Sequence, residues 1–564
     1  MKNPRFASCT WKFLTLVGAV ACLVRPVVVC AAPASIELKN PAGALITQAV
    51  GRQSIQLEIV SPTTMKRARI VVQVAPYDAH GAPAAWISPA RTSVWDLRPG
   101  STQMTVNVNL GHRGLFLVNA QLLSTQGTAL AHKAFNLAVI PRRGHTGPGD
   151  FGVATHFAQG KGAPEILLPL IRNAGFSWIR DELYWDQIEK QPGRMIFPPR
   201  FDAYLLTASR LKITPLIVLS YGNATAYPEL FKRSPFPQSS EARAHFRRYV
   251  AELLERYDKE VKHWEVWNEP EFGKIGYDNY VNLLKDVYVE IKQRSPDASV
   301  ISCGGGGSGG GPGGDCLTEL IQRGALDYQD GFSIHPYMSP NTPEIGYRAI
   351  GAPIESVSIP SVWPYLKAFV ARNPKTNGQL LQLWVTEFGW PVRRNVPGQN
   401  EAMQAAYLIR SYLLSRRYNA ARVLFWYDFA DDGIDPDDIE QNFGLLHSDF
   451  TPKPAFIAAA VLSSTLENRA WAKSLFDDDE VKVYQYDAVN PLLVGWTSGA
   501  QEREVSLHLP PGDYVQRDWQ GIDSPMTVTA QGFDWHLGPM PRYLFPLRQG
   551  PSHSLQTGMP GEKR

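Results

Sequence analysis

Three things are scarce in this 564-residue sequence: cysteine, an excess of charge of one sign, and long apolar runs. There are five cysteines, and 56 lysines and arginines stand against 53 aspartates and glutamates. Because the charges nearly balance and no basic run occurs, a nucleic-acid partner is not expected. The apolar run 13–24 is too short to span a bilayer, so no stable membrane insertion is expected either.

The N-terminus nevertheless has the pattern of a targeting segment. Three basic residues precede the run 13–24, and the small residues of "VVVCAAPAS" follow it. This order predicts a cleaved secretory signal over 1–32 and a secreted or periplasmic protein. A lipoprotein signal ending in "AVAC" at Cys22 is the alternative, although the leucine expected three residues before the cysteine is missing.

Two cysteines remain beyond this segment, and they enclose a glycine run. Cys303 and Cys316 bracket "GGGGSGGGPGGD". In an exported protein such a pair predicts a disulfide, which for a loop of this length contributes about 3 kcal/mol. A phosphate-binding loop is excluded, because the run ends in Gly-Asp-Cys where that motif needs Gly-Lys-Ser/Thr.

A metal site is not predicted. The acidic stretch "DDGIDPDDIEQN" at 431–442 lacks the alternating ligand order of a calcium loop, so it is interpreted as a solvated rim. No organic cofactor is expected either.

The two ends of the chain read as β structure. Short alternating segments such as "SIQLEIV" and "MTVNVNL" fill 33–140 and predict an N-terminal β-sandwich, followed by a Gly- and Pro-rich linker at 141–150. Segments such as "EVKVYQYD" and "LLVGWTS" predict a second sandwich over 469–548. The polar tail 549–564 is expected to be disordered.

Between these ends, 151–468 alternates strand and helix patterns. Eight strand candidates run from "FGVATHF" to "ARVLFWYDF", separated by helical stretches such as 241–260 and 277–295. Eight such repeats predict a (β/α)8 TIM barrel flanked by the two sandwiches. The strand-to-helix connections are the long ones, and in a barrel these gather at the C-terminal face, where active sites lie. A doubly wound open sheet, the alternative fold, explains neither feature.

Two glutamates end strands of this barrel. Glu269 closes the fourth strand in "HWEVWNEPE", and Glu387 closes the seventh in "WVTEFGW". A pair of carboxyl groups at one face suits glycoside hydrolysis, in which one protonates the leaving oxygen and the other attacks the anomeric carbon. Glu271 is a rival acid, but it lies past Pro270 and is interpreted as a rim residue.

These motifs resemble known enzymes. "WEVWNEP" and "TEFGW", together with "SIHPY", "FWYDF" and "FGLLHSDFTPKPAF", are similar to clan A glycoside hydrolases. The set most resembles family 39-like enzymes, including those of bacterial exopolysaccharide systems. The resemblance implies a retaining O-glycosyl hydrolase without a metal or cofactor.

The resemblance also assigns roles. It implies that Glu269 is the acid/base and Glu387 the nucleophile, which Arg180 and Tyr337 would hydrogen-bond. Asn268 would bind the sugar 2-hydroxyl. The substrate-binding residues expected at the strand ends are Asn268, Arg180, His335, Tyr337, Trp426, His156, Trp390 and Trp185. Trp426 would be the floor beneath the sugar at the cleavage point.

For some of these residues a structural role stays open. His335 and His156 could be hydrogen-bonded core histidines, although site roles are favoured. Trp185, Trp390 and Tyr221 could stack on sugars or pack inside the fold. Glu265 has the inward parity of Glu269 and is expected to be a buried, paired group.

The sequence thus predicts a secreted, monomeric retaining glycosidase that cuts a bacterial exopolysaccharide or other polysaccharide internally. A non-catalytic polysaccharide-binding or matrix-assembly protein is the rival interpretation. Exo-cleavage and transglycosylation also stay open, because the covalent intermediate is shared by hydrolysis and transfer.

Overall fold

The computed structural model describes residues 33–39, 43, 45–142, 149–270, 275–305, 314–349, 354–394 and 396–547. The expectations for the signal 1–32, most of the linker, Glu271 and the tail 549–564 lie outside these residues.

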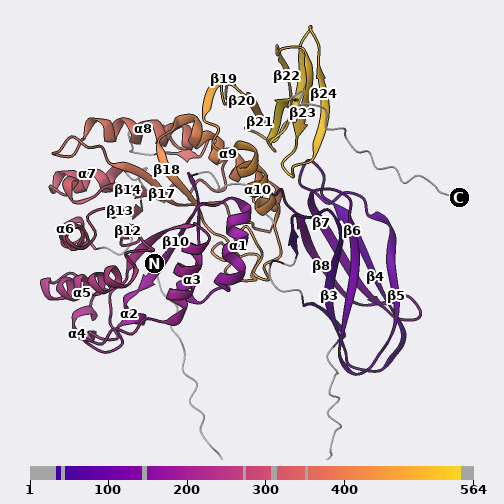
Figure 1. Cartoon of the computed structure of the whole chain (residues 1–564), viewed down its shortest axis with the longest axis horizontal. Coiled ribbons are helices and arrows are strands. Elements are labelled where there is room, and N and C mark those ends of the chain that lie inside the picture. Colours follow the sequence, from indigo (N-terminus) through magenta and orange to yellow (C-terminus); the bar gives the residue numbers. More distant parts are fainter. Residues whose placement is uncertain are drawn as a thin grey trace, which may run out of the picture.

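The central unit is a closed barrel of eight parallel strands (Figure 1). Seven of the strands fall within segments where the sequence predicts one, and the fifth begins in the predicted segment 298–303 and ends two residues beyond it, so the barrel prediction is confirmed. In barrel order the strands are β9 (Phe151–Ala154), β10 (Trp178–Tyr184), β11 (Thr214–Ser220), β12 (His263–Val266), β13 (Ser299–Gly305), β14 (Gly331–Ile334), β17 (Gln382–Phe388) and β18 (Ala421–Trp426).

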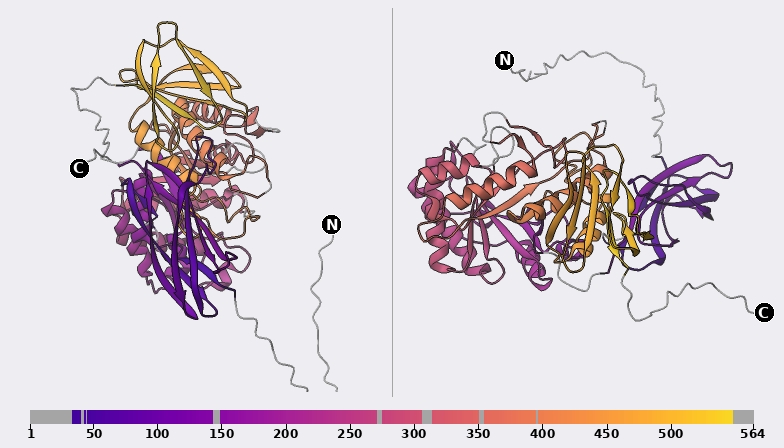
Figure 2. Two further views of the ribbon diagram at one scale, coloured as in Figure 1. Left: turned by 90° about the vertical axis from the view of Figure 1, so that its right-hand side faces the viewer. Right: turned by 90° about the horizontal axis from the view of Figure 1, so that it is seen from above.

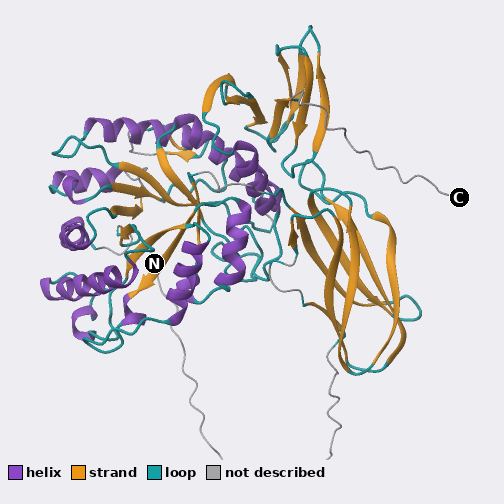
Figure 3. Cartoon of the chain, in the orientation of Figure 1, coloured by secondary structure: helices purple, strands orange, loops and turns teal. Residues whose placement is uncertain are grey.

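Helices surround this barrel (Figure 3). Two of the longer ones begin at side-chain caps: Ser239 accepts a hydrogen bond from the amide of Ala242, and Asn400 accepts one from that of Met403. Among the described residues, no helix is both long and apolar enough to cross a membrane. The helices are α1 (Pro164–Ala174), α2 (Trp185–Ile188), α3 (Pro199–Arg210), α4 (Pro228–Phe231), α5 (Ser240–Tyr257), α6 (Tyr277–Arg294), α7 (Gly314–Gln322), α8 (Ile359–Arg372), α9 (Glu401–Tyr418) and α10 (Pro454–Leu466).

The N-terminal unit contains two sheets, ordered β1-β3-β6 and β2-β8-β7-β4-β5. Inward residues of both sheets belong to one buried apolar cluster. Strands β2 and β5 were not predicted: one has two residues, and the other contains a proline and polar side chains. The strands are β1 (Ser35–Leu38), β2 (Ile46–Thr47), β3 (Gly51–Ser61), β4 (Met65–Pro76), β5 (Ile87–Leu97), β6 (Gly100–Leu110), β7 (Gly114–Leu123) and β8 (Ala129–Val139).

The C-terminal unit has a six-stranded sheet, β19-β20-β21-β26-β23-β24, and the pair β22-β25. A further pair, β15 (Tyr347–Arg348) and β16 (Ser356–Val357), lies in the loop after β14. The C-terminal strands are β19 (Trp471–Asp477), β20 (Val481–Tyr486), β21 (Leu492–Thr497), β22 (Arg503–Leu507), β23 (Gly512–Arg517), β24 (Asp523–Val528), β25 (Phe533–Leu537) and β26 (Arg542–Pro546).

Both flanking units are joined to the barrel and to each other, as the further views show (Figure 2). Asn136 donates to the carbonyl of Pro452 at 2.9 Å, which connects the N-terminal unit to the barrel. Gln520 of the C-terminal unit accepts from the amide of Leu115 at 3.0 Å and donates to the carbonyl of Tyr77 at 2.9 Å. These contacts hold the flanks in place beside the barrel loops.

Candidate active site

The lower interior of the barrel, toward the N-terminal ends of the strands, is apolar. Alternate residues of a strand face the same side, so every second residue points inward. One buried cluster fills this layer: Trp178, Leu216, Ile301, Trp384, Val423 and Phe425. The packing is tight enough to require glycine in β9, because a Cβ on Gly152 would lie 2.6 Å from the Phe425 ring. This half of the barrel is filled by side chains.

The next inward layer is polar. Arg180 follows Trp178 by two residues, and Thr386 follows Trp384 in the same way. The fully buried Glu265 collects three donors, from Arg180 Nε at 2.7 Å, Ser333 Oγ at 2.5 Å and Thr386 Oγ1 at 2.8 Å. A buried carboxylate is tolerable when it is paired and hydrogen-bonded in this way. The expectation of a buried, paired Glu265 is therefore met.

Glu387 lies directly above this layer. Arg180 Nη1 donates to its Oε1 at 2.7 Å, and the Tyr337 hydroxyl donates to its Oε2 at 2.9 Å. Burial alone would raise the pKa of Glu387, but the charges of His335 and Arg180 and the Tyr337 hydrogen bond lower it below its usual value. Glu387 is thus held ionised.

Glu269 reaches the same place from the turn after β12. The backbone at Trp267 and Glu269 is left-handed, with φ of 72° and 48°. The amide of Glu269 donates to the Gly304 carbonyl at 2.6 Å, which fixes the turn against the end of β13. Its side chain is 29% exposed, against 12% for Glu387. Glu269 is therefore the carboxyl group more open to solvent.

The two glutamates are close together. One carboxylate oxygen of each, with a ring nitrogen of His335, forms a group whose atoms all lie within 4.8 Å of one another. This spacing could suit a cation, but Arg180 and Tyr337 already donate to the two oxygens of Glu387. The arrangement fits proton and glycosyl transfer better than metal binding.

A chain of donors assigns the protons of His335. Thr386 uses its hydroxyl proton toward Glu265, so its oxygen must accept from His335 Nε2, 3.0 Å away. Nε2 therefore carries a proton, and Nδ1 faces Glu269 Oε1 at 3.0 Å. Burial lowers the pKa of His335, but Glu387 and Glu269 raise it more, so it ends above its usual value. A proton can thus be shared between His335 Nδ1 and Glu269.

Asn268 is bound to the same network. Its Oδ1 accepts from Arg180 Nη2 at 2.8 Å. One guanidinium therefore contacts Asn268, Glu265 and Glu387, and its orientation depends on all three.

His156 lies at the end of β9, in a second group of charged residues. Its Nδ1 is 3.0 Å from Asp432 and 3.6 Å from Asp428, and Lys161 binds Asp432 at 2.7 Å. Burial opposes protonation of His156, but the two aspartates raise its pKa to about 9. Because Asp432 is already paired with two cations, this group holds a metal less readily than its spacing suggests. A cavity of about 240 Å³ adjoins it.

The predicted sugar contacts of three tryptophans are wrong. Trp185 and Trp426 are 0% exposed and Trp390 is 1% exposed. Their indole nitrogens donate inside the protein, to Glu189, the Phe443 carbonyl and the Asn341 carbonyl respectively. None of the three rings presents a face to a ligand, so the packing alternative holds for Trp185 and Trp390.

Strand parity explains the error at Trp426. Val423 and Phe425 point into the barrel, so Trp426 points outward, where it stacks on Trp390 at 5.9 Å. Tyr427 has the inward parity, and its ring lies 5.7 Å from His156 and 6.4 Å from Tyr337. Tyr427 is therefore the aromatic residue at this strand end, and counting from Phe425 could have found it.

Glu182 is a site residue that sequence reasoning missed. It follows Arg180 by two residues, so the inward parity of β10 was the available signal. Its carboxylate accepts from the Tyr184 hydroxyl, and Tyr221 lies 3.5 Å away. Burial, with the charges of Asp181 and Glu387 adding and Arg180 opposing, raises its pKa to about 7.

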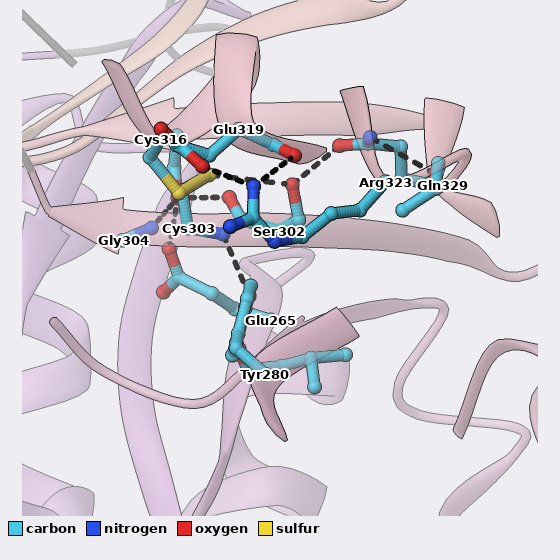
Figure 4. Close-up of a disulfide and its surroundings, with 12 residues drawn as sticks. Glu265, Tyr280, Ser302, Cys303, Gly304, Cys316, Glu319, Arg323 and Gln329 are labelled. Carbon is cyan, nitrogen blue, oxygen red and sulfur yellow. Dashed lines mark hydrogen bonds and ion pairs between the residues drawn. A yellow bond between two sulfur atoms is a disulfide. The ribbon is translucent and has the colours of Figure 1, made fainter. Parts of the chain in front are cut away.

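Cys303 and Cys316 form the predicted disulfide, which joins the end of β13 to α7 (Figure 4). The Cys303 amide donates to the Tyr280 hydroxyl at 2.8 Å, and that hydroxyl donates to the Val266 carbonyl at 2.8 Å. The next residue, Gly304, supplies the carbonyl that binds the Glu269 amide. The disulfide thus secures the segment on which Glu269 rests.

Comparison with known proteins gives one strong match. No protein-family model and no curated protein matches the chain. A solved family 39 glycoside hydrolase from the gut symbiont Bacteroides cellulosilyticus WH2 is 34% identical, with a TM-score of 0.78 over 91% of this chain and 100% of that chain.

Two other solved structures are more distant. A GH30 endoxylanase from Clostridium papyrosolvens C71 is 12% identical, with a TM-score of 0.47 over 71% of this chain and 96% of its own. Bacteroides uniformis β-glucuronidase 2 is also 12% identical, with a TM-score of 0.39 over 92% of this chain and 60% of its own. At these values neither bears on the activity of this chain. On the 34% match over nearly the whole length, the chain belongs to family 39 of the glycoside hydrolases and is an O-glycosyl hydrolase of clan A.

Proposed function

We propose that the protein is a retaining glycoside hydrolase in which Glu387 is the nucleophile and Glu269 the acid/base. The observation that carries this proposal is the approach of their carboxylate oxygens to within 4.8 Å. Retaining enzymes place their two carboxyl groups about 5–5.5 Å apart, whereas inverting enzymes need about 6.5–9.5 Å to admit a water.

The surroundings support this division of roles. Glu387 has an arginine and a tyrosine as donors, which favour the ionised form that attacks the anomeric carbon. Glu269 is more exposed and contacts His335, so it can give a proton to the leaving oxygen and later take one from water. In the first step Glu387 bonds to the anomeric carbon, the glycosidic bond breaks and the leaving oxygen takes a proton from Glu269. In the second step water attacks the same carbon, gives a proton to Glu269 and releases the Glu387 carboxylate.

The substrate we propose is a bacterial exopolysaccharide or another polysaccharide, cut internally. Stacking by several rim tryptophans no longer supports internal cutting, because those rings are buried. The support that remains is the set of long loops after the strands and a cavity of about 1110 Å³ beside two of them. A rapid fall in polymer size with a ladder of oligosaccharides is expected early in digestion. Monosaccharide as the sole early product would refute internal cutting.

We also propose that the protein is exported after cleavage of 1–32 and acts as a monomer. The two flanking units are interpreted as β-sandwiches, because both N-terminal sheets contribute to one buried cluster. Sizing and N-terminal sequencing of the native protein would check the first two points.

The test of the catalytic roles uses substrates with different leaving groups. Glu269→Ala should lose about 10²–10⁴-fold on substrates with poor leaving groups, because they need protonation. Aryl glycosides with very good leaving groups should still form the covalent intermediate quickly. The control is Glu255→Ala, an exposed glutamate on α5, which should behave as wild type. An equal loss on both substrate classes would contradict the acid/base assignment.

A further inference from the structure

The loop after β18 has two sides with different charge. On the side of the active site, Asp432 pairs with His156 and Lys161. The pKa of Glu440, in the same loop, is raised mainly by burial. The negative charges of Glu387, Asp438 and Glu269 raise it further. On this side the carboxyl groups are therefore either paired with cations or have a raised pKa.

The other side of this loop borders a cavity of about 1110 Å³. The N-terminal unit supplies one wall and the loops after β17 and β18 supply the opposite wall. Representative lining residues are Tyr77, Phe135 and Asn136 on the first wall and Arg393, Arg394 and Ile434 on the second. The acidic side chains of Asp435, Asp437, Asp438 and Glu440 are not part of the lining. The volume lies slightly above the range of small-molecule sites, about 300–1,000 Å³, and leaves room for more than one sugar ring.

Most charges in this cavity are already paired. In three pairs both members line the cavity: Lys453 with Asp431 at 2.7 Å, His447 with Glu401 at 3.4 Å, and Lys133 with Asp449 at 3.7 Å. Two of these pairs join a lysine to a carboxylate, and the third places a histidine ring beside Glu401.

Two guanidinium groups are left over. Among the described residues, neither Arg393 nor Arg394 has a carboxylate within 4 Å. The Nε of Arg393 is buried and has no hydrogen-bond partner there. A buried donor of a charged group that lacks an acceptor is unfavourable. Because both arginines line the cavity, an anionic ligand would meet two guanidinium groups there that are not paired with any described carboxylate.

The cavity also adjoins the smaller cavity beside His156. Asp431 lines both this cavity and the smaller one of about 240 Å³ that His156 and Asp428 border. In that smaller cavity the buried Asp428 Oδ1 has no partner among the described residues. Asp431 therefore lies between the cavity that His156 borders and the cavity that contains the two arginines.

We propose that the larger cavity binds a carboxylate-bearing sugar of the polysaccharide substrate. This rests on the proposed function and makes the substrate a polysaccharide that contains acidic sugars. The planar fork of an arginine pairs with a carboxylate through two parallel hydrogen bonds, which a neutral hydroxymethyl group cannot replace.

The test compares two probes that differ only at the sixth carbon. Binding of a β-1,4-linked glucuronate tetramer and of cellotetraose is measured by calorimetry at low and high salt. Wild-type protein should bind the acidic tetramer at least tenfold more tightly at low salt, and salt should reduce the difference. Equal binding of the two tetramers, or binding of neither, would overturn the proposal.

Variants locate the effect. The double variant Arg393→Gln, Arg394→Gln should lose the preference for the acidic tetramer, whereas Arg372→Gln, an exposed arginine at the end of α8, should keep it. If the double variant does not fold, Arg394→Gln alone replaces it, since that residue is exposed. A preference that survives the loss of the arginines contradicts the site.

These outcomes are separate from those of the proposed function. Binding is measured without turnover, so it does not depend on which glutamate is the nucleophile. Absence of hydrolysis of any glycoside would refute the proposed function alone, and loss of the charge preference would refute the acidic-sugar site alone.

Discussion

The lower and upper halves of the barrel interior differ over a distance of two residues. Trp178 and Trp384 lie in an apolar layer, and Arg180 and Thr386, two positions further along the same strands, lie in a charged network. At about 3.3 Å per residue the change takes about 7 Å. The comparison shows that depth in the barrel separates two kinds of side chain. Apolar packing residues lie toward the N-terminal ends of the strands, and the charged candidate site residues lie toward the C-terminal ends.

The two halves should also fail differently when they are mutated. A cavity in the apolar layer removes burial and dispersion from the folded state, so it lowers stability. A change in the charged layer removes groups that the reaction needs, and the fold around them is held by the layer beneath. Four substitutions test this contrast.

The largest effect is expected at the top of the barrel. Glu387→Ala should lower turnover by about 10⁴-fold or more, because it removes the carboxylate that we propose as the nucleophile. Added azide should restore part of the activity and give a product of inverted configuration. Stability measured by urea unfolding should stay close to wild type, and azide-insensitive activity would contradict the assignment.

In the lower half, Trp384→Ala should lower the free energy of unfolding by about 3–5 kcal/mol, because it leaves a cavity among fully buried rings. Turnover per folded molecule should change far less. Urea unfolding and active-site titration separate the two quantities. A loss of turnover without a loss of stability would contradict the contrast, because it would show that the apolar layer serves the reaction and not the stability of the fold.

A smaller effect on turnover is expected at the disulfide between Cys303 and Cys316, which joins the upper half of the barrel to helix α7. Cys316→Ser should lower turnover by about 10- to 100-fold, because the Gly304 carbonyl that holds the Glu269 amide is no longer tethered. Dithiothreitol should reproduce this loss in wild type and add nothing in the variant. Unchanged activity after verified reduction would contradict the link.

The smallest effect concerns the proton on His335. Thr386→Val removes the acceptor for Nε2–H, so the protonated His335–Glu269 pair loses stabilisation and the alkaline limb of the pH–rate profile should move to lower pH. Thr386→Ser keeps the hydroxyl and should leave the profile in place. If both variants shift equally, the hydroxyl is not the cause.

Sequence reasoning located the eight barrel strands because each combined an apolar run with a turn signal, and it brought Glu269 and Glu387 to one face because both close such strands. The resemblance to clan A enzymes, and not the strand pattern, placed Arg180 and Tyr337 beside them. Sequence reasoning failed where a shift of one residue decides which side chain faces the barrel interior, as between Trp426 and Tyr427. It also failed at Trp185 and Trp390, because whether a ring is exposed depends on distant helices and loops that local patterns do not describe.

The bond between Cys303 and Cys316 has a consequence for when the enzyme is active. Oxidation closes it, and the turn that carries Glu269 rests on the strand end that it secures. A newly made chain in a reducing compartment would then be folded but have low turnover. Its turnover would rise only if the chain reached an oxidising compartment, where the disulfide closes. The cell that makes it would be protected from its own hydrolase without an inhibitory pro-segment.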